Sequence, residues 1–358
     1  MLQTKIKSFF NKLVRYAVRI LNSLAEQFTS AFNKAVKIRF TNFWFEPPQL
    51  PPETTFFLKP LLKTFIQAQQ KYQIVHYAPA DIQFFSVFGR RQVIERSRAK
   101  YKIFYTGENV SGNSRVDSYK QYNDYVSDQT RLDQIKLSLG FNFLAKENYL
   151  RLPLWLWYFF DPYSSKDKIR HKLKEFWNTN SGKRQKFCAL VASHDNKNNL
   201  RAEIHNTLSS IGQVDCPGKL LHNDDSLKTV FADNKIIYLR QYKFNICPEN
   251  SHGNGYVTEK LFQALHAGCI PIYNGYSPDP EPNIINPKVI LWFEPNSNNT
   301  QTLKQVKELW ADEQKYRTFL AQNCFLDTAP EMIHDYLKKY CAALEEIAEK
   351  SLKPGHPR

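Results

Sequence analysis

The stretch YKFNICPENSHGNGYVTEKLFQALHAGCIPIYNG, residues 242–275, carries the pattern that decides the fold. Its first residues predict a strand, a polar glycine-rich loop follows, and an amphipathic helix then leads into a second strand. Strands that alternate with helices in this way indicate an α/β fold with a mostly parallel sheet. In such sheets, ligands bind at the carboxyl ends of strands, where loops enter helix N-termini. We therefore expect a ligand site in the loop at the centre of this stretch.

The same alternation extends to both sides of this stretch. Strands are predicted at 36–44, 73–78, 81–89, 101–107, 186–193 and 289–294, and helices at 56–72, 200–212, 302–322 and 332–350. A chain of 358 residues is long enough for two domains. We predict an N-terminal α/β domain over 35–182, a C-terminal one over 183–350, and a disordered tail over 351–358.

Composition narrows the class of protein. The net charge of +15, from 49 basic and 34 acidic residues, suggests an anionic partner or only a soluble basic surface. Because the basic residues are spread along the chain without interleaved aromatics, we expect no nucleic acid partner. The cysteines lack CxxC or zinc-like spacing and predict buried free thiols in a reducing compartment: Cys188, Cys216, Cys247, Cys269, Cys324 and Cys341.

Residues 1–34 predict a basic amphipathic helix. Phe, Leu and Ile side chains share one side, and early lysines and arginines lie on the other. This pattern fits an interfacial helix on an anionic membrane surface, and it fits equally a helix that packs on the protein or self-associates. No secretory signal is visible, and the longest apolar run, 152–160, is too short to span a bilayer. We expect a cytoplasmic protein or one peripheral at the cytoplasmic face of a membrane.

Three predicted strand-to-helix loops carry candidate site residues. Glu108 follows the strand at 101–107, and Arg201 lies in the first turn of the helix at 200–212. The third loop, after 242–247, carries Glu249, Asn250, Tyr256, Glu259 and Lys260. Glycines allow close backbone approach, and a helix N-terminus with a lysine favours an anion. These residues predict a phosphate-bearing ligand, although a Glu-Lys pair in a first helical turn is also a common surface cap.

The third loop also carries a family resemblance. ENSHGNGYVTEKLFQALHAGCIPIYNG (249–275) resembles the donor-binding motif of the α-1,3/1,4-fucosyltransferases of glycosyltransferase family 10, in particular the bacterial type. KIFYTGEN (102–109), RLPLW (151–155) and VASHDNKNNLRAEI (191–204) extend the resemblance over roughly residues 36–330. Three departures replace residues that are often aromatic in the family: Pro248, Asn254 and Asn274.

The resemblance implies a GT-B architecture, in which two Rossmann-like domains face each other across a cleft. The C-terminal domain would bind GDP-fucose, and the N-terminal domain an oligosaccharide acceptor. Fucose would move with inversion to O3 of GlcNAc or Glc in a lactose- or N-acetyllactosamine-type glycan. By position, Glu108 would be the general base, and Arg201 and Lys260 would hold the diphosphate. The remaining donor contacts would be Asn250, Tyr256 and Glu259.

No metal cofactor is expected to be obligatory. The sequence has no DxD triplet, and Arg201, Lys260 and a helix end can replace a divalent cation. Mn²⁺ or Mg²⁺ would at most stimulate the transfer. The acidic segment DPE at 279–281, which comes nearest to a DxD triplet, is interpreted as structural. Trp155 and Trp157 are interpreted as core or interdomain packing in preference to a sugar platform. The alternatives are a transferase that uses another GDP-sugar or another acceptor, a nucleic-acid-binding protein, and a membrane scaffold.

Overall fold

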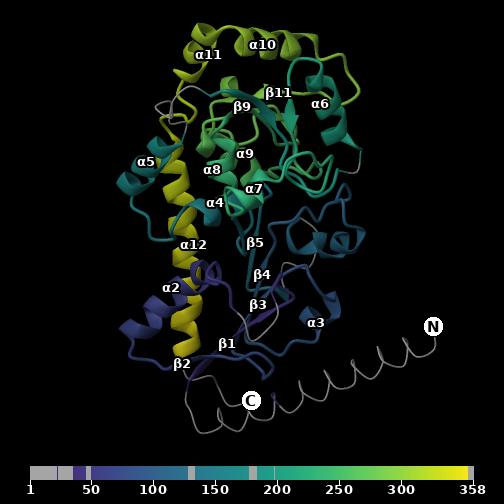
Figure 1. The fold of residues 1–358 in the computed structure, drawn as a ribbon. Coiled ribbons are helices and arrows are strands. Elements are labelled where there is room, and N and C mark those ends of the chain that lie inside the picture. Colours follow the sequence, from purple (N-terminus) through teal and green to yellow (C-terminus); the bar gives the residue numbers. More distant parts are fainter. Residues whose placement is uncertain are drawn as a thin grey trace, which may run out of the picture.

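The computed structural model describes residues 22, 35–45, 50–127, 134–176, 184–196 and 198–353 (Figure 1). The helix predicted over 1–34 lies outside the described residues apart from Asn22, as does the predicted boundary between the two domains at 182–183. Membrane contact by residues 1–34 therefore stays a prediction. Within the described residues, no helix has the length and apolarity needed to cross a bilayer.

The N-terminal half forms a parallel sheet with strand order β2-β1-β3-β4-β5-β6. Its strands are β1 (Val36–Thr41), β2 (Tyr72–Ile74), β3 (Ile82–Phe85), β4 (Tyr101–Tyr105), β5 (Leu137–Gly140) and β6 (Tyr149–Arg151). Around it lie α2 (Thr54–Gln67), α3 (Arg91–Glu95), the 3-10 helix η1 (Asp117–Tyr125), α4 (Leu154–Phe159) and α5 (Lys166–Glu175). Every residue of β3 and β5 is buried, as expected for parallel strands covered on both faces.

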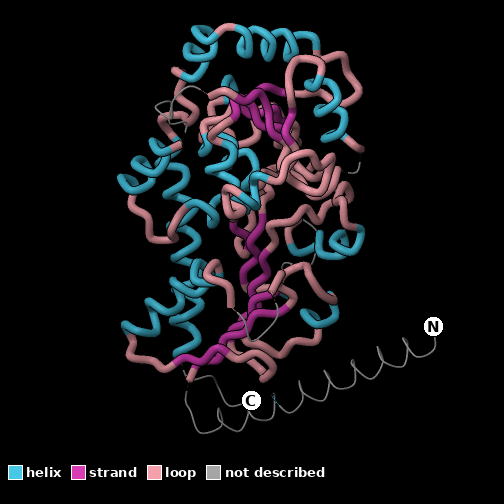
Figure 2. Tube along the Cα trace, viewed as in Figure 1, coloured by secondary structure: helices cyan, strands magenta, loops and turns pink. Residues whose placement is uncertain are grey.

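The C-terminal half forms a second parallel sheet with strand order β11-β10-β9-β7-β8. Its strands are β7 (Lys186–Ala189), β8 (Val214–Asp215), β9 (Tyr242–Ile246), β10 (Ile270–Tyr273) and β11 (Leu291–Trp292). Its helices are α6 (Leu200–Ser209), α7 (Ser226–Thr229), α8 (Lys235–Leu239), α9 (Glu259–Ala267), α10 (Thr300–Ala311) and α11 (Glu313–Leu320). Figure 2 shows the two sheets one above the other, each flanked by helices. The predicted α/β fold with parallel sheets is confirmed.

The central stretch folds as its pattern predicts. β9, the loop, α9 and β10 follow in order, and β9 pairs with β10 and β7 in parallel. Thr258 begins α9 by accepting a hydrogen bond from the Lys260 backbone N–H, and Gly268 ends it at φ 74°. The site loop is therefore held between a buried strand and a capped helix.

The last helix, α12 (Ala329–Leu352), reaches from the C-terminal half onto the N-terminal half. It belongs to 183–350 in sequence, but it packs on α2 and α5 of the N-terminal half (Figure 1). Pro60 inside α2 lacks the N–H that would bond to the Phe56 carbonyl. The hydroxyl of Tyr340 on α12 donates to that carbonyl oxygen at 3.3 Å and replaces the lost bond. Residues 351–352, predicted to be disordered, continue α12.

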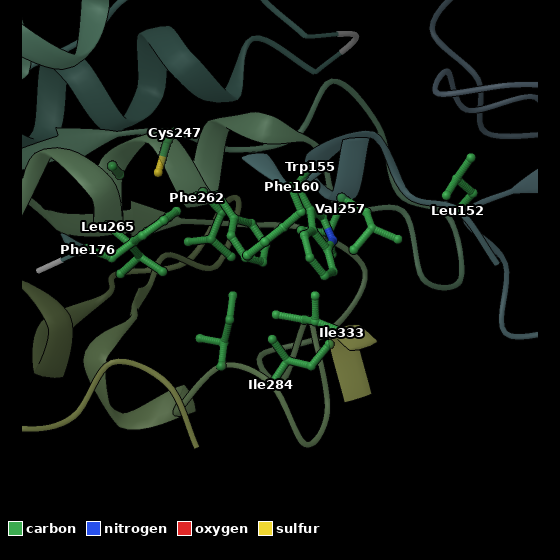
Figure 3. Packing of buried hydrophobic residues seen from close by; sticks show 14 of the residues in the cluster. Leu152, Trp155, Phe160, Phe176, Cys247, Val257, Phe262, Leu265, Ile284 and Ile333 are labelled. Atoms are coloured by element: carbon green, nitrogen blue, oxygen red, sulfur yellow. The ribbon is translucent and has the colours of Figure 1, made fainter. Parts of the chain in front are cut away.

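One apolar core joins the two halves. Figure 3 shows side chains from the N-terminal half, from the C-terminal half and from α12 in a single cluster. Trp155 is fully buried and stacks on Phe262 of α9, with centroids 4.3 Å apart and planes at 12°. The interpretation of Trp155 as interdomain packing is thereby confirmed. All six cysteines are buried and free, as predicted.

Candidate active site

The predicted site residues meet where the two halves face each other. A cavity of about 120 Å³ is lined by Glu108, Asn109, Ser114, Arg115, Val116, Tyr119, His194, Asn250, Ser251 and Tyr256. A second cavity of about 300 Å³ shares Asn250 and Ser251 and includes Asn113, Asn196, Asn198 and His252. Both cavities are lined by loops that follow the carboxyl ends of β4, β7 and β9. This is the position where open parallel sheets bind ligands.

Glu108 is the acidic residue of the smaller cavity. Its backbone N–H donates to Thr106 Oγ1 at 3.0 Å, and that hydroxyl donates to the Glu108 carbonyl at 2.8 Å. Burial raises the pKa of Glu108, and the positive charge of Lys260 acts against this rise. A carboxylate with a raised pKa is a better proton acceptor near neutral pH than an exposed one.

Asn109, next to Glu108, fastens the two halves together at the site. Its Nδ2 donates to Ser251 Oγ at 2.9 Å and to the His252 carbonyl at 3.1 Å. A side chain at Gly253 would place its Cβ 3.1 Å from the amide of Asn109, so glycine permits this close approach. Sequence reasoning did not single out Asn109, although it ends the KIFYTGEN segment. The contact fixes the Glu108 loop against the loop after β9.

Arg201 connects the loops after β7 and β9. It is 3 % exposed, and its guanidinium donates to the His194 carbonyl at 2.6 Å and to Asn250 Oδ1 at 2.7 Å. The carboxylate of Asp195 accepts from the backbone N–H of Arg201 at 2.9 Å and so caps α6. Burial lowers the pKa of Arg201, but a guanidinium begins so high that it stays charged.

Lys260 places a second cation at the start of α9. Its Nζ donates to Thr258 Oγ1 at 2.9 Å, and it lies 3.6 Å from Glu249 Oε2 and 3.9 Å from Glu259 Oε1. Burial alone would lower the pKa of Lys260, but Glu259 and Glu249 outweigh it and the pKa is raised. The ammonium group therefore stays charged even without a ligand.

Glu249 has a structural part in this group. It is 1 % exposed and accepts hydrogen bonds from the Thr258 N–H at 2.8 Å, the Thr258 hydroxyl at 2.7 Å and the Tyr273 hydroxyl at 3.2 Å. These contacts hold the loop against β10 and fix the first turn of α9. Glu249 thus orients Lys260 instead of facing the cavity.

Glu259 lies next to a third cation that sequence reasoning missed. Burial alone would raise the pKa of Glu259, but Lys260 and Lys235 together lower it. Lys235 begins α8, which packs on α9. No periodicity or motif in the sequence marks Lys235, because its position depends on how α8 meets α9.

Tyr256 is held by the N-terminal half. It is 2 % exposed, and its ring meets that of Phe141 edge to face, with centroids 4.9 Å apart. Gly255 next to it has φ 75°, and a Cβ there would lie 2.4 Å from the Phe141 carbonyl oxygen. Arg151 donates to the Gly255 carbonyl at 3.0 Å. The turn before Tyr256 therefore needs glycine.

Two sequence features near the site have structural explanations. Asn274, one of the three departures from the family pattern, is buried. Its Oδ1 lies 2.7 Å from His252 Nε2, and its Nδ2 donates to the Phe293 carbonyl at 3.0 Å. Glu281 is fully buried and accepts from Arg151 at 2.8 Å and from Trp155 Nε1 at 2.6 Å. These contacts agree with the structural interpretation of 279–281.

Of the predicted site residues, Glu108, Asn250 and Tyr256 line the smaller cavity. Arg201, Glu259 and Lys260 line neither of the two cavities: Arg201 is hydrogen-bonded to Asn250, and Glu259 and Lys260 lie together at the start of α9. Two facing α/β units, with a half-buried carboxylate on one and cations on the other, indicate an enzyme of two α/β domains with a site for an anionic ligand between them. The model of the C-terminal part of glycosyltransferase family 10 (fucosyltransferase) matches residues 181–355. The model of the N-terminal domain of α-(1,3)-fucosyltransferase FucT matches residues 38–158. The chain belongs to glycosyltransferase family 10, the fucosyltransferases.

Individual relatives agree with this assignment. The chain is 27 % identical to the α-(1,3)-fucosyltransferase FucT of Helicobacter pylori over 332 residues, which is 83 % of this chain and 62 % of the relative. It is 31 % identical to the GDP-fucose protein O-fucosyltransferase 3 of Gallus gallus over 123 residues, 30 % of this chain and 24 % of the relative. The chain therefore spans about three-fifths of the length of the first relative and about one quarter of the length of the second.

Solved structures show the same fold. A crystal structure of an α1,3-fucosyltransferase superposes with a TM-score of 0.56 at 24 % identity, covering 87 % of this chain and 92 % of that one. A structure of an α1,3-fucosyltransferase with GDP-fucose superposes with a TM-score of 0.52 at 23 % identity, covering 86 % and 90 %. The predicted GT-B-like architecture is confirmed.

Proposed function

We propose that this chain is an inverting α-1,3-fucosyltransferase. It moves L-fucose from GDP-β-L-fucose to O3 of GlcNAc or Glc in a lactose- or N-acetyllactosamine-type glycan and forms an α-L-fucoside. The observation that carries the proposal is the shared cavity, to which one half contributes Glu108 and the other Asn250 and Tyr256. Lys260 lies in the first turn of α9, directly after the loop that carries Asn250 and Tyr256, and its positive charge opposes the rise in the pKa of Glu108.

The proposed reaction gives each of these groups one role. The acceptor hydroxyl gives its proton to the Glu108 carboxylate while its oxygen attacks C1 of fucose from the face opposite the diphosphate. The bond from C1 to the β-phosphate oxygen breaks, and its electron pair leaves with GDP. Attack from the opposite face converts the β-linked sugar into the α-fucoside. Asn250, Tyr256 and Glu259 contact the donor, with Glu259 near the ribose or the fucose.

Electrostatics favours this assignment of roles. A positioned general base contributes about 10²–10⁴-fold to the rate. Negative charge that develops on the leaving diphosphate is stabilised by cations already fixed in place, commonly the largest single contribution. Arg201 and Lys260 meet that condition, because each is held by several contacts before any ligand binds.

We propose that no divalent cation is obligatory, because these fixed cations can neutralise the diphosphate. Added Mn²⁺ or Mg²⁺ would then stimulate by a modest factor, through contact with the nucleotide itself. Turnover measured in excess EDTA tests this point, and complete loss of transfer that Mn²⁺ restores would contradict it.

The decisive experiment is incubation with GDP-fucose and a panel of acceptors, with products detected by mass. We expect a single fucose to be added to type 2 N-acetyllactosamine or lactose, with release of GDP and an α-configured product by NMR. GDP-mannose serves as the matched donor control. A serine- or threonine-containing peptide belongs in the panel, because one relative carries the name of a protein O-fucosyltransferase. Transfer only to the peptide, or only from another GDP-sugar, would contradict the proposal.

A further inference from the structure

Two exposed aromatic side chains and one half-buried one follow three neighbouring strands of the N-terminal sheet. Trp44 comes after β1, Phe88 after β3, and Tyr119 within η1, in the connection that follows β4. Because β1, β3 and β4 are adjacent and parallel, these connections leave the same edge of the sheet. Trp44 is 39 % and Phe88 41 % exposed, and because their rings are in contact they form a continuous apolar patch, which indicates a binding surface more than isolated exposed residues do. We call Trp44, Phe88 and Tyr119 the aromatic ladder.

The aromatic ladder begins at the candidate active site. Tyr119 lines the same cavity as Glu108. Burial and the nearby Glu108 carboxylate both raise the pKa of Tyr119. The centroids of Tyr119 and Phe88 are 5.7 Å apart, and those of Phe88 and Trp44 are 6.3 Å apart. The rings therefore form a continuous series that leads away from Glu108.

The connections that carry the aromatic ladder are braced against one another. The Phe88 backbone N–H donates to the Asn42 carbonyl at 2.9 Å, and Asn42 Nδ2 donates to the Arg90 carbonyl at 3.1 Å. The Tyr122 hydroxyl donates to the Gly89 carbonyl at 2.8 Å and ties η1 to the same corner. At the far end, the ring of Trp44 stacks on that of Trp157, with centroids 5.8 Å apart and planes at 11°.

These contacts fix three aromatic rings at a water-facing surface before any ligand arrives. Preorganised aromatic side chains offer a large contact area at little cost in conformational entropy. Sugar rings are matched to such a surface, because a pyranose presents an apolar face of C–H groups and a rim of hydroxyls. Neighbouring rings of the aromatic ladder meet edge to face, with centroids 5.7 and 6.3 Å apart and planes at 74°, so that together they offer ring faces and edges over a length greater than one sugar ring.

We propose that the aromatic ladder binds the sugar rings of the acceptor that lie beyond the one receiving fucose. The acceptor is then an extended neutral oligosaccharide, longer than the disaccharide that contains the reactive hydroxyl. The proposal rests on the proposed function, because Glu108 defines the end of the ladder at which transfer occurs. It favours a glycan acceptor over a peptide.

Acceptor length tests the proposal. The measured quantity is kcat/KM for a tetrasaccharide of two N-acetyllactosamine units, divided by kcat/KM for the single disaccharide. Wild type should favour the tetrasaccharide. Phe88→Ala should lower this ratio about two- to tenfold, mainly through KM for the longer acceptor, because one ring contact is lost. Trp44→Ala should act in the same direction, and Phe88→Tyr, which keeps the ring, should restore the ratio.

Tyr72 provides the matched control. It is 42 % exposed and belongs to the same sheet, but it lies at the start of β2, at the opposite edge. Tyr72→Ala should leave the ratio at the wild-type value. A ratio near one in wild type, or an unchanged ratio in Phe88→Ala with normal folding by circular dichroism, overturns the proposal.

Binding without turnover separates this inference from the proposed function. Saturation-transfer NMR measures contact between the tetrasaccharide and the protein in the absence of donor. Weaker contact in Phe88→Ala but not in Tyr72→Ala supports the aromatic ladder, even if GDP-fucose is never used. Equal contact in both variants overturns it, even if disaccharides are fucosylated.

Discussion

The buried ion pair between Arg151 and Glu281 joins the two halves and offers a quantitative test of the interdomain contact. The side chains are 6 % and 1 % exposed, and their closest atoms are 2.8 Å apart. Arg151 also donates to the carbonyls of Phe141 at 2.9 Å and Gly255 at 3.0 Å. Glu281→Gln keeps the shape and the acceptor for Trp155 Nε1 but removes the negative charge. Arg151 is then a buried cation with only neutral partners.

The expected loss is about 3–5 kcal/mol of unfolding free energy, the usual result of removing one partner from a buried pair. The matched control is Asp167→Asn, whose exposed pair with Arg170 at 2.8 Å should contribute less than about 1 kcal/mol. Urea unfolding followed by tryptophan fluorescence gives both values, since Trp155 lies in the contact. A loss for Glu281→Gln no larger than that for Asp167→Asn would refute the reasoning. Because Arg151 also holds the turn before Tyr256, GDP affinity should fall in Glu281→Gln and stay unchanged in the control.

Three further substitutions test individual contacts. Glu108→Gln should reduce turnover about 10²–10⁴-fold and leave GDP affinity nearly unchanged in calorimetry, and unchanged turnover would exclude Glu108 as the base. Lys260→Ala should weaken GDP and GDP-fucose together by about 10- to 100-fold, because a charged hydrogen bond is lost, and intact nucleotide affinity would contradict the diphosphate assignment. Tyr340→Phe should cost about 1–3 kcal/mol in urea unfolding, because the Phe56 carbonyl in α2 loses its replacement donor. An unchanged midpoint would show that water satisfies this carbonyl.

The sequence predicted the structure best in the stretch that carries both a clear strand and helix pattern and the candidate site residues. Residues 242–275 predict β9, α9 and β10 because the strands are continuous apolar runs and the helix has a 3.6-residue period. The parallel-sheet rule places Arg201 and Lys260 at the carboxyl edge of the C-terminal sheet and Glu108 at the carboxyl edge of the N-terminal sheet. Strand direction alone does not say that these two edges face each other, and that expectation came from the family resemblance.

Contacts between elements were not predictable in the same way. The run 152–160 is apolar throughout and has no period, so the sequence pattern did not predict α4 within it. The periodicity of α12 predicts a helix but does not say which half it packs on. Asn109 and Lys235 act through partners in loops and helices distant in the chain, and a single sequence does not encode such pairings in any spacing. The aromatic ladder was missed for the same reason, since its rings belong to three separate connections.

The charges of the site imply that donor binding prepares the base. In the free protein, burial raises the pKa of Glu108 while the positive charge of Lys260 opposes the rise. A diphosphate bound to Lys260 neutralises that charge and adds negative charge nearby, so both changes raise the pKa of Glu108 further. The pH profile of kcat/KM for the donor reports the free enzyme, whereas that of kcat reports the loaded one. In the proposed mechanism Glu108 must be deprotonated, so activity should rise with pH through its pKa. The acid limb of kcat should then lie at higher pH than the acid limb of kcat/KM. Coincident limbs, or a limb for kcat at lower pH, would show that Lys260 and the diphosphate do not act on Glu108 in this way.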